Sequence, residues 1–156
     1  MIGLIIAIIV FNSVAFLTVK RLTTNQIVHI WTFTISLQSL VDLYLDFQYK
    51  GYWYFTANHI EWFAFLPLTM VIPPVNMMFL NWYPFHTSLV KRFIYTVLWV
   101  FFILFYESLT LLPEPWGYFH YGWWKLGYSA ICDPILLILV LFYYKWIRKI
   151  EKSANL

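Results

Sequence analysis

The 156-residue chain has few charged residues, since only 11% of its positions are Asp, Glu, Lys or Arg. Its hydrophobic fraction is 62% and its aromatic fraction 23%, a composition far from the soluble average. This composition leaves no room for a soluble domain and predicts an integral membrane protein. The net charge of +3 does not indicate a nucleic-acid partner, because basic residues in such a chain are explained by membrane topology.

The sequence is also poor in cysteine and in recognisable catalytic motifs. Cys132 is its single cysteine, so no intramolecular disulfide can form, and we expect the thiol to pack as a small hydrophobe. There is no glycine-rich phosphate loop, no paired-cysteine metal motif and no nucleophile elbow. We therefore expect no cofactor, and the sequence favours a protein that is not an enzyme without deciding the question.

What the sequence does contain is a series of apolar runs, each long enough to cross a bilayer as a helix. They predict an all-α, polytopic membrane protein, a single transmembrane domain that is a bundle of five helices. A signal peptide is the alternative for the first run, where Ser13 and Ala15 resemble a cleavage site, but a basic start is lacking. The runs cover residues 1–19, 27–45, 62–80, 93–112 and 128–147, and a short basic tail follows at 148–156.

The connections between these runs alternate in charge. By the positive-inside rule this alternation places the N-terminus outside and the C-terminus in the cytoplasm, and it favours an uncleaved first helix. Only Lys50 and Lys125 fall on the predicted outer side. The basic residues of the predicted inner side are Lys20, Arg21, Lys91, Arg92, Lys145, Arg148, Lys149 and Lys152.

Three carboxylates, Asp42, Glu107 and Asp133, lie inside apolar runs, in stretches without Lys or Arg. Ionisable groups inside a membrane are costly and usually mark a site. Each acid is about 7 to 10 Å from the outer end of its run at 1.5 Å per residue. The three acids therefore share one depth, where they can be protonated, share protons or hold a cation.

The second run adds a polar stripe to these acids, because Thr34, Gln38, Asp42 and Asp46 recur every four residues and share one helix face. We predict a carboxylate-rich pocket in the outer half of the bundle that binds a proton, a cation or a cationic small molecule. The alternative is that protonated carboxyls only bond helices together. The predicted pocket residues are Gln38, Asp42, Asp46, Glu61, Glu107 and Asp133.

Two imidazoles and two carboxylates in the outer loops could hold a metal ion. Their number suits zinc, yet their spacing matches no specific ligand pattern, so ordinary interfacial residues are the favoured interpretation. These residues are His59, Glu61, Glu114 and His120.

The third run contains the pair Pro73 and Pro74, which leaves the carbonyls of Thr69 and Met70 without helical donors. We expect a helix break here, with Asn76 either satisfying a freed carbonyl or lining a cavity. Broken helices line binding sites in transporters, although proline kinks are also common in ordinary membrane bundles.

Runs two and three, and runs four and five, have a similar order of features. Each pair has an acid in its rising helix, a Gly-Tyr pair in its outer loop (Gly51-Tyr52 or Gly117-Tyr118) and proline in its descending helix. This order suggests two related helical hairpins after one N-terminal helix. Compositional bias in two aromatic loops accounts for the likeness equally well.

Aromatic side chains crowd both outer loops. Interfacial belts explain this placement, and a cage that stabilises a cation above the acids is the alternative. The outer aromatic residues are Tyr52, Trp53, Tyr54, Trp116, Tyr118, Trp123 and Trp124.

The segments PPVNMMFLNWYPF, from Pro73 to Phe85, and LLPEPWGYFHYGWWK, from Leu111 to Lys125, carry a resemblance. They resemble small, uncharacterised multi-span integral membrane proteins of Gram-positive spore-forming bacteria, over about Trp31 to Glu151. The resemblance implies a helical bundle in a bacterial plasma membrane and transfers no activity.

Two other functions remain open from the sequence. One is an intramembrane lipid-modifying enzyme of the isomerase or cyclase type, with a protonated carboxyl as general acid. The other is a structural or accessory subunit of a larger membrane complex. The partners expected are accordingly the lipid bilayer, a cationic or lipid small molecule, or a membrane protein.

Overall fold

The computed structural model describes residues 1–56 and 62–154, most of which are helical. This confirms the all-helical class. The α-helices are α1 (Ile2–Thr18), α2 (Thr24–Asp42), α3 (Ile72–Trp82), α4 (Leu89–Thr110) and α5 (Leu126–Ser153). Short π-helical turns at Leu43–Gln48 and Pro67–Val71, a 3-10 turn at Trp62–Ala64, and the strands β1 (Tyr52–Tyr54) and β2 (Phe119–Tyr121) complete the described elements.

Within the described residues, three helical segments are long and apolar enough to cross a membrane, namely Trp62–Trp82, Leu89–Thr110 and Leu126–Ser153. They match the third, fourth and fifth predicted runs. The apolar α1 is shorter, with 17 residues. The second run folds as α2, a helix whose Thr, Ser, Asn and Gln side chains lower its hydropathy.

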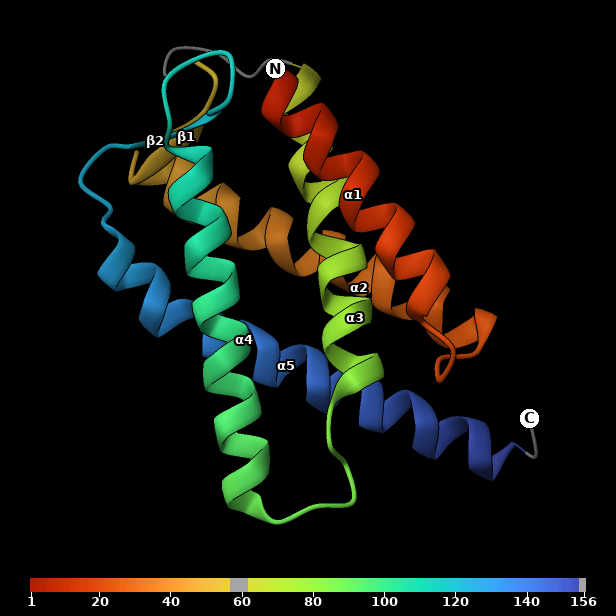
Figure 1. Cartoon of the computed structure of the whole chain (residues 1–156). Coiled ribbons are helices and arrows are strands. Elements are labelled where there is room, and N and C mark those ends of the chain that lie inside the picture. Colours follow the sequence, from red (N-terminus) through yellow and green to blue (C-terminus); the bar gives the residue numbers. More distant parts are fainter. Residues whose placement is uncertain (57–61, 155–156) are drawn as a thin grey trace.

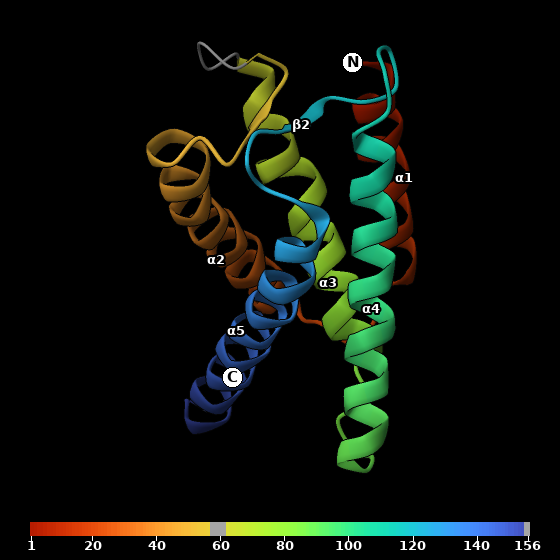
Figure 2. The same cartoon turned by 90° about the vertical axis from the view of Figure 1, so that its left-hand side faces the viewer.

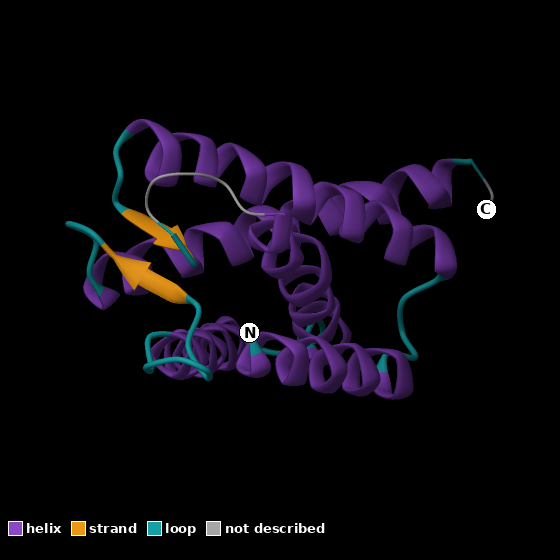
Figure 3. Ribbon diagram, turned by 90° about the horizontal axis from the view of Figure 1, so that it is seen from above, coloured by secondary structure: helices purple, strands orange, loops and turns teal. Residues whose placement is uncertain are grey.

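The helices form two layers around α3. Seen from above, α2 and α5 run antiparallel on one side of α3, while α1 and α4 lie on the other (Figure 3). α4 stands nearly upright in Figure 1, whereas α2 and α5 are strongly inclined to it. Figure 2 shows from the side that α2 and α5 lie apart from α1 and α4. The N-terminus and both strands lie at one end of the molecule, and the α1–α2 and α3–α4 connections lie toward the other (Figure 1).

The apolar pattern of α1 explains why this helix is part of the bundle. Leu4, Ala7, Phe11 and Ala15 recur every three or four residues, are all buried, and give α1 one face that packs against α3. Hydrogen bonds also fix the connection between α1 and α2, because Asn81 Oδ1 accepts from the backbone N–H groups of Lys20 and Arg21, at 3.1 and 3.0 Å.

The proline pair lies where the π-helical turn Pro67–Val71 gives way to α3, with Pro73 and Pro74 in the first turn of the new helix. The first turn of a helix tolerates proline because its N–H groups have no intrahelical partner. Pro74 still deprives the Met70 carbonyl of its donor four residues on, and Asn12 of α1 replaces that donor, with Nδ2 at 2.7 Å from the carbonyl oxygen. Asn76 does not satisfy this carbonyl and instead donates to Thr34 Oγ1 at 3.1 Å.

The segments that follow α2 and α4 pair as an antiparallel ladder, with Tyr52 opposite Tyr121, Trp53 opposite His120 and Tyr54 opposite Phe119. Side chains alternate across a strand, so Tyr52, Tyr54, Phe119 and Tyr121 share one face. On the other face the rings of Trp53 and His120 stack, with centroids 6.2 Å apart. This sheet was not predicted, and it joins the two hairpins directly.

Candidate functional site

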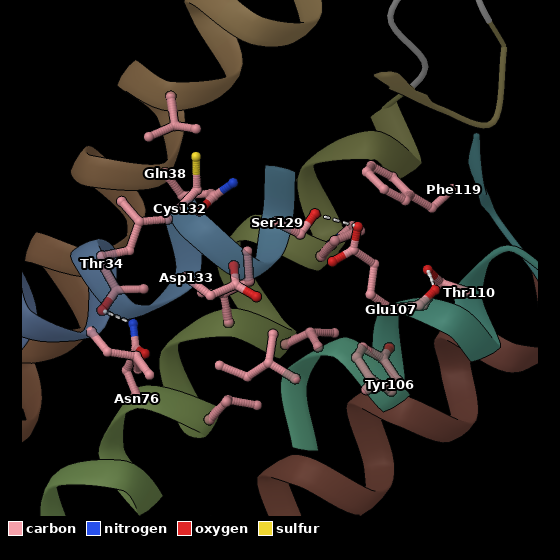
Figure 4. Close-up of a pocket in the computed structure, with 18 of the residues that line it drawn as sticks. Thr34, Gln38, Asn76, Tyr106, Glu107, Thr110, Phe119, Ser129, Cys132 and Asp133 are labelled. Atoms are coloured by element: carbon pink, nitrogen blue, oxygen red, sulfur yellow. Dashed lines mark hydrogen bonds between the residues drawn. The ribbon is translucent and has the colours of Figure 1, made fainter. Parts of the chain in front are cut away.

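A cavity of about 200 Å³ lies between α2, α3, α4 and α5, next to the paired strands (Figure 4). A buried water needs roughly 10–15 Å³, so this space has room for several waters or a small molecule. Most of its lining is apolar. The described residues that line it include two carboxylic acids and no Lys, Arg or His. The polar lining residues are Thr34, Gln38, Tyr52, Tyr54, Asn76, Tyr106, Glu107, Thr110, Tyr118, Ser129 and Asp133.

Glu107 of α4 is the more strongly bonded of the two acids. Its Oε1 accepts from the Tyr121 hydroxyl and from Ser129 Oγ, the latter at 2.7 Å. Ser129 in turn accepts from Trp124 Nε1 at 2.9 Å, which fixes the direction of the serine hydroxyl. The carboxyl of Glu107 is thus held in place from α5 and from β2, as Figure 4 shows for Ser129.

Asp133 of α5 is an acid of the cavity lining with free capacity for a ligand, whereas Asp42, which also has an unpartnered Oδ2 atom, is absent from that lining. Asp133 lies four residues after Ser129, and therefore on the same helix face, about 6 Å further along the axis. Its Oδ2 atom is buried and has no hydrogen-bond partner among the described residues. Figure 4 shows its carboxyl in the middle of the cavity, between the Asn76–Thr34 pair and Glu107. Asp133 and Glu107 are close enough to repel each other when both are ionised.

Asp42 of α2 does not line this cavity. It is 4% exposed, and its Oδ1 accepts from Gln38 Nε2 at 3.0 Å and from the Tyr52 hydroxyl. Gln38 and Tyr52 do line the cavity, so they separate Asp42 from it. Of the three acids at one depth, the structure brings together Glu107 and Asp133 and places Asp42 behind them.

The ladder partners Tyr52 and Tyr121 supply one hydroxyl to each rising helix. Tyr52 donates to Asp42 of α2, and Tyr121 donates to Glu107 of α4. Burial raises the pKa of both tyrosines well above the ordinary value, so both phenols keep their protons and act as donors at neutral pH. The likeness between the two hairpins thus extends to this hydrogen bond, although α2 and α4 differ in tilt (Figure 1).

Of the two other predicted pocket residues, only Asp46 is described by the structure. Asp46 is half-buried but absent from the lining. The stripe predicted by a spacing of four does not continue to it, because residues Leu43–Gln48 form a π-helical turn with more residues per turn than an α-helix. Glu61 lies outside the described residues, as does His59.

Only two of the four predicted metal ligands, Glu114 and His120, are among the described residues. Glu114 is exposed and His120 stacks on Trp53. In the described part of the chain no three His, Cys, Asp or Glu side chains form a group that could hold a metal ion. Of the predicted outer aromatic residues, Tyr52, Tyr54, Tyr118 and Trp124 line the cavity, whereas Trp116 and Trp123 are about half exposed, at 53% and 49%.

Sequence reasoning missed Ser129, Tyr121 and Cys132 as part of the site. The four-residue spacing of Ser129 and Asp133 was a usable signal, because it places a hydroxyl and a carboxyl on one face of α5. The alternation Tyr-x-Tyr and Phe-x-Tyr in the two outer loops was a second signal, since it is the period of a strand.

No family model, curated protein or solved structure matches this chain. The functional argument therefore depends on the residues of the cavity alone.

Proposed function

We propose that this protein is a five-helix membrane protein that binds a small organic cation, in exchange for protons, in the cavity between Glu107 and Asp133. In this proposal the N-terminus is outside, the C-terminus is cytoplasmic, and the membrane is a bacterial plasma membrane, as the resemblance implies. The observation that carries the proposal is the buried, unpartnered Oδ2 atom of Asp133 in a cavity that holds a second acid and no basic lining residue.

Charge balance is the first argument. A buried carboxylate needs a partner charge, and among the described lining residues none is basic. The charge must be neutralised by protons or by a cation that is not part of the chain. An ammonium ion that enters the cavity would displace those protons and occupy the space between the two carboxyls.

The aromatic lining is the second argument, because it distinguishes an organic cation from a metal ion. Tyr54, Tyr106, Phe119 and Trp124 line the same cavity, and aromatic faces attract ammonium groups. Calcium and magnesium are bound through six or more oxygen ligands and gain nothing from aromatic faces, so an aromatic lining favours the organic cation.

The membrane arrangement is supported by the distribution of apolar and basic side chains. The surface of α4 is covered with exposed apolar residues, including Phe93, Phe101 and Phe105, as expected of a helix that contacts lipid. The three basic segments that follow α1, precede α4 and end α5 lie away from the strands (Figure 1), which agrees with a single cytoplasmic side.

The test is binding of tetramethylammonium to the reconstituted full-length protein, measured by calorimetry together with proton release to a pH-sensitive dye. We expect Glu107→Gln and Asp133→Asn each to weaken binding about tenfold or more, since each removes a negative charge, and the attraction of two opposite charges about 4 Å apart is about 4 kcal/mol near a protein surface. Glu114→Gln is the matched control, because Glu114 is exposed and outside the cavity lining. Unchanged binding and proton release in the Glu107→Gln/Asp133→Asn double variant would refute the proposal.

A further inference from the structure

A second recess, which we call the arginine recess, lies where three distant segments meet. The segments are the start of α2 with the residues before it, the connection between α3 and α4, and the C-terminal half of α5. Its volume is about 300 Å³. It is lined by Arg21, Gln26, Phe85, His86, Tyr144 and Arg148.

Two arginines converge on one aromatic ring in this recess. The guanidinium carbon of Arg21 is 5.8 Å from the centroid of Phe85, and that of Arg148 is 5.7 Å from the same centroid and 5.7 Å from that of Tyr144. Such stacking holds a guanidinium through its face and leaves its N–H edge available. Arg21 uses one nitrogen, Nη1, to donate to the Tyr83 carbonyl at 2.8 Å.

The acids of the described chain do not form ion pairs with the arginines of the recess. In the part of the chain that the structure describes, neither Arg21 nor Arg148 forms an ion pair. Glu151, the acid beside Gln26, accepts instead from Asn25 Nδ2 at 2.8 Å and from Gln26 Nε2. Two like charges around one ring repel each other, so an anion between them would stabilise this arrangement.

We infer that the arginine recess binds a phosphate-bearing anion, either the headgroup of an anionic lipid or a soluble phosphate compound. Guanidinium groups form paired hydrogen bonds with phosphate oxygens, and two of them with an imidazole from His86 provide donors from three directions. The inference is independent of the cation cavity, which has different lining residues.

The experiment uses the full-length protein in detergent, with inorganic phosphate titrated by calorimetry and phosphatidylglycerol retention measured by native mass spectrometry against phosphatidylcholine. We expect Arg21→Gln and Arg148→Gln each to weaken binding about tenfold, which corresponds to one lost charge-assisted contact. The affinity of Arg148→Lys should lie between that of these variants and that of the wild type, because lysine keeps the charge but lacks the planar guanidinium that forms paired hydrogen bonds. This variant also keeps the test valid should Arg148→Gln fail to fold.

Lys152→Gln is the matched control, since it removes one positive charge from the exposed end of α5 outside the recess. Retention of phosphatidylglycerol alone assigns the recess to a lipid headgroup, and binding of inorganic phosphate alone assigns it to a soluble compound. The inference is overturned if wild type binds neither, if both arginine variants bind as wild type does, or if Lys152→Gln weakens binding equally. The Glu107→Gln/Asp133→Asn variant should bind phosphate normally, which separates this test from that of the cation cavity.

Discussion

At the scale of single residues, Asn12 of α1 supplies the hydrogen-bond donor that the proline pair before α3 removes from a backbone carbonyl. Its Nδ2 donates both to Ile8, within α1, and to the Met70 carbonyl, at 2.8 and 2.7 Å. Met70 lost its helical donor because residue 74 is proline. The stability of the irregular segment before α3 thus depends on one amide in α1.

In the proposed membrane arrangement, lipid and not water surrounds the exposed Met70. We therefore predict that Asn12→Leu destabilises the protein by about 1–3 kcal/mol, the cost of a backbone carbonyl left without a donor. Unfolding in a denaturing detergent series, followed by circular dichroism, measures the change. Ser13→Leu is the control, because Ser13 is exposed on the same helix. If Asn12→Leu is as stable as Ser13→Leu, another group must satisfy the Met70 carbonyl.

Asp42 differs from Glu107 and Asp133 in that it is absent from the cavity lining, although it has two donors as Glu107 does. Asp42→Asn keeps the Oδ1 acceptor, so we predict folded protein that binds tetramethylammonium within about twofold of wild type, as expected for a residue outside a binding site. Calorimetry on this variant beside Asp133→Asn makes the comparison. A tenfold loss in Asp42→Asn would place Asp42 in the site.

At the scale of elements, the ladder between β1 and β2 closes the outer side of the cavity and requires a glycine. Gly122 donates its backbone N–H to the Gly51 carbonyl at 2.8 Å, and a Cβ at Gly122 would be 2.5 Å from the Lys50 carbonyl oxygen. A larger residue there must push the two loops apart.

We predict that Gly122→Val increases the rate at which a water-soluble maleimide alkylates Cys132, the one cysteine of the chain and a residue of the cavity lining. An increase of about fivefold or more follows if loop pairing loses 1 kcal/mol. Gly127→Ala is the control, since a Cβ at Gly127 meets nothing within 4 Å. An unchanged rate in Gly122→Val would show that the ladder does not control access.

Helices could be predicted from the sequence where apolar residues formed long runs. The apolar runs predicted helices, and the capping box of Thr23 and Gln26 marks the start of α2. The π-helical turns were not predictable, because a change from α to π leaves no periodic signal in six residues. That change is why Asp46 leaves the stripe that begins at Thr34.

At the scale of the whole molecule, the sequence predicts the distance of each acid from the end of its helix but not the direction in which its side chain points. Depth follows from counting residues at 1.5 Å each, and it grouped Asp42, Glu107 and Asp133, of which Glu107 and Asp133 line one cavity. Direction depends on how α4 and α5 rotate against each other, which is decided by packing across distant parts of the chain. For this reason Asp42 could not be separated from the other two acids in advance.

The proposed topology predicts which exposed positions face which side of the membrane. In a Cys132→Ser background, we expect Trp116→Cys to react with an impermeant maleimide in intact cells and Lys152→Cys to react only after lysis. Both side chains are exposed, so their reactivity reports the side and not burial. The reverse pattern would invert the orientation, and labelling of both in intact cells would contradict a membrane crossing by α5.

The pairing of Tyr52 with Tyr121 has a thermodynamic consequence. Each tyrosine holds an acid on a different helix, and the two are opposite each other in one short ladder. A gain or loss of a proton at Glu107 changes the strength of the hydrogen bond that Tyr121 donates to it. This change alters the pairing of β2 with β1, and therefore the hydrogen bond from Tyr52 to Asp42. By linkage the effect is reciprocal, so the proton occupancies of two acids that do not share a cavity are expected to be cooperative.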